Sequence, residues 1–94
     1  MNISWDENKN RIYFFKHGFS FEDAEKVFEG ETLTFEDDHF DYGEKRFIML
    51  GYMEGRFVQI VHAESEDSEN IRLISMRKGS KYEQKIYQER LKKN

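Results

Sequence analysis

The stretch from residue 46 to residue 64, RFIMLGYMEGRFVQIVHAE, most constrains the fold of this chain. Two runs rich in Phe, Ile and Val, 46–53 and 56–64, flank the dipeptide Glu54-Gly55. A two-residue connection with Gly in second place is typical of a tight hairpin turn. The two runs are therefore expected to be adjacent antiparallel strands, with side chains alternating between the two faces of a sheet.

Further strands and helices are expected on both sides of this hairpin. Short β-type runs at 32–35 and 69–77 bring the number of strands to four. The helix signals are Ser4 with Glu7 before a helix ending at Gly18, Ser20 before a helix ending at Gly30, and Ser80 with Glu83 before a C-terminal helix with Tyr82, Ile86, Tyr87 and Leu91 as its apolar face. We therefore expect one α+β domain over 1–94: two N-terminal helices, a four-stranded antiparallel meander and a C-terminal helix, with the helices on one face.

Composition excludes several classes of protein. The chain has no Cys, so disulfides and thiolate metal sites are excluded. Its three histidines, His17, His39 and His62, fall on separate elements, and no Gly-rich phosphate loop is present, so we expect neither a metal nor a cofactor. No signal peptide and no stretch long enough to span a membrane is apparent, which predicts a cytoplasmic protein with no membrane partner.

Charge is distributed unevenly along the chain. The net charge of −4 argues against general nucleic-acid binding. However, residues 77–93 hold 7 of the 15 Lys and Arg residues, whereas the acidity gathers at 36–44 and 64–69. The acidic 36–44 loop is interpreted either as a solvated surface or as a docking site for a basic partner.

The strand 69–77 carries Arg72 inside an apolar run, and a buried cation of this kind requires a partner. If this strand pairs with 56–64 through the 65–69 turn, alternation places His62, Glu64 and Arg72 close together on one sheet face. One interpretation is a structural ion pair across the strands. The other is a site for phosphate.

The phosphate interpretation corresponds to metal-free RNA cleavage, in which the 2′-hydroxyl is the nucleophile. That reaction needs a base, and cations for the charge that develops on the phosphate. Glu64 or His62 would be the base, with Arg72, Arg77 and Lys16 holding the phosphate.

The sequence also resembles a known family over nearly its whole length. The BrnT toxin family begins with a W-D/E segment and continues through K-H-G and F-E-E-A to V-F. The corresponding residues here are Trp5-Asp6, Asn10, Lys16-His17-Gly18, Phe21-Glu22-Asp23-Ala24 and Val27-Phe28. IRLISMRKGSKYEQKIY also resembles the family's R-I-I-S-A-R-K-A segment and the helix that follows it.

The resemblance implies a metal-independent ribonuclease toxin with a RelE-like fold. It implies an RNA substrate and a BrnA-type antitoxin partner, which would also supply all contact with DNA. The catalytic residues that it implies are Lys16, Glu64, Arg72 and Arg77, with His17, Arg56 and Tyr87 as further members of the active face. With His62 and Lys78, which the residue patterns add, the predicted RNA-binding or supporting residues are His17, Arg56, His62, Lys78 and Tyr87.

Some positions depart from the family pattern. Ser65 stands where an Arg is frequent, Ala63 where Thr is common, and Met76 where Ala is common. A cation missing from the active face, in a chain of net −4, leaves a second hypothesis open. In that alternative the chain is a weak or inactive relative whose function is to bind a partner.

Overall fold

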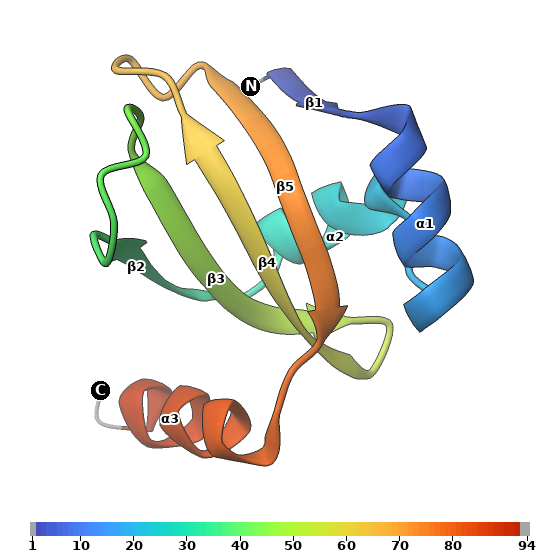
Figure 1. Ribbon diagram of the computed structural model, residues 1–94. Coiled ribbons are helices and arrows are strands. Elements are labelled where there is room, and N and C mark those ends of the chain that lie inside the picture. The colour runs from blue at the N-terminus through green and yellow to red at the C-terminus, as the bar shows by residue number, and fades with distance from the viewer. Residues whose placement is uncertain (1, 93–94) are drawn as a thin grey trace.

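The computed structural model describes residues 2–92 as a five-stranded sheet with three helices (Figure 1). The elements in chain order are β1 (Asn2–Trp5), α1 (Glu7–His17), a 3₁₀ helix (Phe21–Asp23), α2 (Ala24–Glu29), β2 (Leu33–Asp37), β3 (Arg46–Met53), β4 (Arg56–Glu64), β5 (Asn70–Lys78) and α3 (Lys81–Leu91). The strands lie in the order β1-β5-β4-β3-β2. β1 runs parallel to β5, and the other neighbouring strands are antiparallel.

The predicted hairpin is confirmed. β3 and β4 begin and end at the expected residues and pair from Arg46↔Ala63 to Met53↔Arg56. Glu54 and Gly55 both have positive φ, 51° and 83°, as a type I′ turn requires. The hairpin is a local structure, and local turn chemistry is sufficient to define it.

The predicted four-stranded antiparallel sheet is wrong, because the chain begins with a strand. Residues 2–5 pair with the start of β5, where Ser4 lies opposite Arg72, and this adds a fifth strand and a parallel pair. The N-cap of α1 is Asp6 rather than Ser4: its Oδ1 accepts hydrogen bonds from the backbone N–H groups of Asn8 and Lys9 at 2.8 and 3.4 Å. The N-cap, and with it the start of the helix, therefore lies two residues later than predicted.

The other helix boundaries follow their sequence signals. Gly18 ends α1 in the left-handed conformation with φ 73°, and the Ser20 hydroxyl accepts from the backbone N–H of Glu22. Ser80 and Glu83 form a complete capping box at the start of α3. The predicted apolar face of α3 is wrong at Tyr82, which is exposed.

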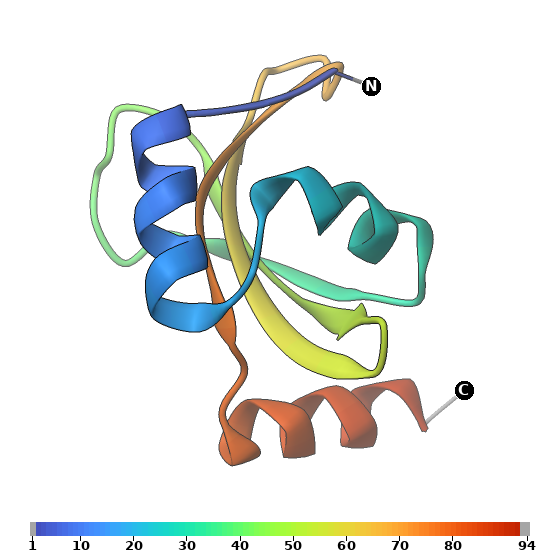
Figure 2. The same ribbon diagram turned by 90° about the vertical axis from the view of Figure 1, so that its right-hand side faces the viewer.

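The helices cover both faces of the sheet, so the prediction of a single covered face is also wrong. Residues from α2 and from the segment after α1 pack with Met49, Val58 and Ile60 to form the larger core. Leu50 and Phe57 point to the opposite face and pack against Tyr87 of α3. Figure 2 shows α3 lying apart from α1 and α2.

β5 departs from strict alternation. Between Val61↔Ser75 and His62↔Leu73 the register shifts, and Ile74 is the extra residue on β5. As a result Arg72 and Arg77, opposite Ala63 and Gln59, project from the same face as α3. His62, on the other face, packs between the rings of Phe47 and Phe28.

Candidate functional site

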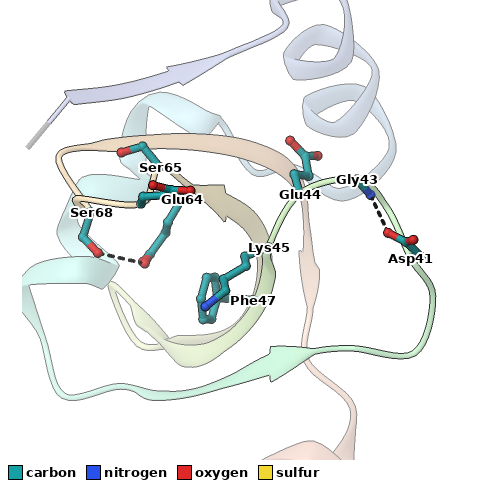
Figure 3. A pocket seen from close by; sticks show the side chains of 9 residues that line it. Asp41, Gly43, Glu44, Lys45, Phe47, Glu64, Ser65 and Ser68 are labelled. Atoms are coloured by element: carbon teal, nitrogen blue, oxygen red, sulfur yellow. Dashed lines mark hydrogen bonds between the residues drawn. The ribbon is translucent and has the colours of Figure 1, made fainter.

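Glu64 lies at an acidic end of the sheet. It lines a groove of about 760 Å³ between the 36–44 loop and the β4–β5 turn, and Figure 3 shows the loop residues on one side and Glu64, Ser65 and Ser68 on the other. The lining residues are Asp41, Gly43, Glu44, Lys45, Phe47, Glu64, Ser65, Glu66 and Ser68. The lining holds four carboxylates and one lysine; Glu44 is paired with two arginines, and the other three carboxylates still make the groove unfavourable for the phosphates of RNA.

His62 is buried beside Glu64 and does not reach the surface. Its side chain is 1% exposed, and within the described chain neither ring nitrogen has a hydrogen-bond partner. Nδ1 is 3.8 Å from the nearer Glu64 carboxylate oxygen. Burial lowers the pKa of His62 to about 4, so the imidazole is neutral at pH 7 and has no route to an RNA substrate.

The expected cluster of His62, Glu64 and Arg72 on one sheet face is wrong. The register shift in β5 places Arg72 on the opposite face, where its guanidinium donates to the Glu44 carboxylate at 2.5 Å. This contact lowers the pKa of Glu44, although burial opposes the effect. Arg72 therefore has an acidic partner, and that partner comes from the 36–44 loop.

Arg77 also has an acidic partner. Its two terminal nitrogens donate to the two oxygens of Glu83 at 3.1 Å, and Gln59 donates to the same carboxylate at 2.6 Å. Tyr87, which is buried, donates its hydroxyl to the backbone carbonyl of Glu31 at 2.8 Å. These contacts attach α3 to the sheet, so in this structure both residues have structural contacts.

The remaining predicted cations meet at the other end of the sheet. A groove of about 680 Å³ forms where the end of α1, the β3–β4 turn, the end of β5 and the start of α3 come together. We call it the cationic groove. Its lining residues are Lys16, His17, Phe19, Tyr52, Gly55, Arg56, Phe57, Lys78, Gly79, Lys81 and Gln84.

The cationic groove contains positive charge that is not neutralised by its own walls. Among the described residues that line it, none is Asp or Glu. Within residues 2–92, Lys16, Arg56, Lys78 and Lys81 form no ion pair. Repulsion among like charges in one groove favours the binding of an anion there.

Local structure positions the cationic side chains at the end of α1 and the start of β4. Lys16 and His17 form the last turn of α1, where positive charge complements the helix dipole, and the ring of His17 stacks on Tyr13. Arg56 follows the hairpin turn; it donates to the backbone carbonyl of Gly18 at 3.4 Å and lies 4.5 Å from the ring centre of Phe19. This contact joins the end of α1 to the start of β4.

The structure thus divides the predicted site between two ends of the sheet. Lys16, His17, Arg56 and Lys78 come together in the cationic groove, whereas Glu64 lies at the far end of β4. Arg56 and Glu64 are the two ends of this nine-residue strand, about 26 Å apart at 3.3 Å per residue. Lys81 is a groove residue that sequence reasoning did not single out, although the cation-rich stretch 77–93 contains it.

Among residues 2–92, no three His, Cys, Asp or Glu side chains are placed to hold a metal ion together. No helix in this range is long and apolar enough to cross a membrane.

Comparison with known sequences supplies the family. No curated protein matches the chain at a significant level. The family model described as the ribonuclease toxin, BrnT, of type II toxin–antitoxin systems matches residues 5–83, which include most of the cationic groove. This chain belongs to the BrnT family of ribonuclease toxins, whose members act in type II systems with a protein antitoxin.

Proposed function

We propose that this chain cleaves RNA at the cationic groove without a metal ion, using the 2′-hydroxyl of the RNA as the nucleophile. The observation that carries the proposal is a groove lined by Lys16, Arg56, Lys78 and Lys81 and by no described carboxylate. Such a groove attracts the RNA backbone, and the cations are in place before the charge on the phosphate develops.

Four residues of the groove have a defined role in this proposal. The 2′-oxygen bonds to phosphorus and the bond from phosphorus to the 5′-oxygen breaks, which leaves a 2′,3′-cyclic phosphate and a 5′-hydroxyl. His17, the imidazole in the groove, accepts the 2′-hydroxyl proton, and the departing 5′-oxygen takes a proton from solvent. Arg56 presents a planar fork to the phosphate oxygens, and Lys16 and Lys78 add point charges.

The experiment is RNA cleavage by purified wild type, Arg56→Ala and Arg72→Ala in the presence of EDTA. Arg72→Ala is the matched control, because Arg72 is an exposed arginine at the acidic end, paired with Glu44. We expect wild type and Arg72→Ala to cleave, and Arg56→Ala to lose at least about tenfold in rate, as removal of a charged contact to the transition state implies. Cleavage lost in Arg72→Ala but kept in Arg56→Ala would place the chemistry at the other end of the sheet.

We further propose that the antitoxin is of the BrnA type and that contact with DNA occurs only through it. The support is membership in the BrnT family together with the acidic surface of this chain away from the groove. A duplex DNA mobility shift should appear with the toxin–antitoxin complex and not with the toxin alone. A shift by the toxin alone would contradict this.

A second candidate function is partner binding with little or no cleavage. Two observations favour it: Arg72 and Arg77 are held by carboxylates, and His62 is buried. This function predicts that folded wild type leaves RNA intact under the same conditions while it still binds its antitoxin. Cleavage that is lost in Arg56→Ala would rule it out.

A further inference from the structure

The outward face of α1 carries three large apolar side chains. Phe15 is 92% exposed, Phe14 58% and Ile12 51%, although none of them is needed for the core. We call these three residues the α1 patch. A phenylalanine with almost its whole surface in water stands apart from the rest of this fold, where large apolar side chains are mostly buried, and it indicates a binding surface.

Two cations of α1 flank the α1 patch. Arg11 is one helical turn before Phe15, and Lys16 is one turn after Ile12. The Arg11 guanidinium donates to Asn8 at 2.7 Å, which holds it on this surface. The nearest acidic residue within the helix is Glu7, whose carboxylate accepts a hydrogen bond from the indole N–H of Trp5 at 2.9 Å.

The α1 patch is also continuous with the cationic groove. Phe14 lies one turn before His17, and Ile12 lies one turn before Lys16; both Lys16 and His17 line the groove. RNA that leaves the groove along α1 would therefore meet two exposed aromatic rings flanked by cations. Aromatic rings beside a basic track are the elements with which proteins bind single-stranded nucleic acid, because bases stack on the rings.

We propose that Phe14 and Phe15 form a stacking platform for unpaired bases of the RNA whose backbone lies in the cationic groove. This inference rests on the proposed function. The cations beside the two rings, Arg11 and Lys16, and the continuity with the cationic groove favour RNA over a protein partner. In this proposal each stacked base adds affinity that the contacts of the groove with the phosphates do not supply.

The test is binding of a fluorescein-labelled, fully 2′-O-methylated single-stranded RNA oligomer, measured by anisotropy with the full chain. The 2′-O-methyl groups remove the nucleophile, so binding is measured without cleavage. We expect Phe15→Ala and Phe15→Leu to weaken binding about 5- to 150-fold, as loss of about 1–3 kcal/mol of stacking implies, and Phe15→Tyr to bind as wild type does. Phe40→Ala is the matched control, because Phe40 is an exposed phenylalanine in the acidic loop and should have no effect.

The outcomes separate this inference from the proposed function. If Arg56→Ala weakens binding and Phe15→Ala and Phe15→Leu stay within twofold of wild type, the groove binds RNA and the stacking platform is refuted. If Arg56→Ala also binds as wild type does, the proposed function fails as well. If Phe15→Ala leaves RNA binding unchanged but abolishes binding of the antitoxin or self-association, the α1 patch is a protein interface and the inference is overturned.

Discussion

Glu83 makes several of the contacts that attach α3 to the sheet, and its removal tests how the last helix is attached. Its carboxylate accepts from the backbone N–H of Ser80 at 2.8 Å and from Gln59 at 2.6 Å, and it pairs with both terminal nitrogens of Arg77. Gln59 is buried, so loss of Glu83 leaves a buried amide without this partner. We therefore expect Glu83→Ala to be strongly destabilising.

The size of the loss follows from these contacts. Loss of one half of a capping box costs about 1 kcal/mol. A buried amide left unsatisfied adds about 1–2 kcal/mol, and the Arg77 pair adds at most about 1 kcal/mol because Arg77 is half exposed. We expect the free energy of unfolding to fall by about 2–4 kcal/mol, which corresponds to a drop of roughly 10–30 °C in Tm for a domain of this size.

The assay is urea unfolding at pH 7, followed by circular dichroism, with Glu89→Ala as the control. Glu89 is an exposed glutamate on the same helix, so its loss should change the free energy of unfolding by less than about 0.5 kcal/mol. If Glu83→Ala and Glu89→Ala are equally mild, the contacts of Glu83 do not attach α3, and Arg77 is then free to bind phosphate.

The same contacts predict how the effect depends on pH. Burial raises the pKa of Glu83, but the hydrogen bond from Ser80 and the ion pair with Arg77 outweigh it, so the pKa is lowered overall. A carboxyl group with a lowered pKa stabilises the folded state above the unfolded-state pKa, and this contribution is lost as pH falls through the folded-state pKa. The difference between wild type and Glu83→Ala should therefore shrink as the pH is lowered below about 4.

Three further predictions concern other parts of the fold. Burial lowers the pKa of His62 to about 4, so as the pH falls below 6.5 the unfolded state takes up a proton at His62 before the folded state does. Protonation of His62 should therefore lower the free energy of unfolding by up to about 3 kcal/mol at pH 4. Urea unfolding at pH 7 and pH 4 should show this contribution in wild type and not in His62→Leu. Gly79→Ala places a Cβ 2.3 Å from the Phe57 ring, so it should cost about 1–3 kcal/mol in the same assay, whereas a mild effect would mean that this ring moves freely. Arg72→Ala should lower the free energy of unfolding by less than about 1 kcal/mol, because its pair with Glu44 is partly exposed, and a larger loss would indicate a structural role for this pair.

Local chemistry made much of the fold predictable. The β3–β4 hairpin depends on two turn residues, and α3 begins at a capping box of two residues three positions apart. Both signals act within a few residues, so the sequence contains all the information that defines them.

The features that were missed depend on contacts between distant segments. β1 is a strand because it pairs with the edge of β5, 68 residues further along the chain at Asn2↔Asn70, and nothing within residues 2–5 indicates that pairing. The pattern of Ser4 and Glu7 fits a capping box as well as Asp6 fits an N-cap, and the pairing of Ser4 in the sheet decides between them.

The candidate site was predictable in its residue types and not in its arrangement. The extra residue Ile74 in β5 reverses the side on which Arg72 projects, and a shift of one residue cannot be read from alternation alone. The cationic groove joins Lys16 to Lys78 and Lys81, more than 60 positions away along the chain. The sequence indicates that these three residues are cations near the ends of predicted elements. That they come together in one groove depends on the topology of the fold.

The arrangement of charge also removes the objection that a chain of net charge −4 should not bind RNA. The acidic groove and the cationic groove lie at opposite ends of β4, about 26 Å apart at the rise of a nine-residue strand. At physiological salt the Debye length is about 8 Å, so the carboxylates at one end are screened over roughly three such lengths. A phosphate at the cationic groove therefore lies much nearer to Lys16, Arg56, Lys78 and Lys81 than to the acidic groove, and the net charge of the chain does not by itself determine whether the groove binds RNA.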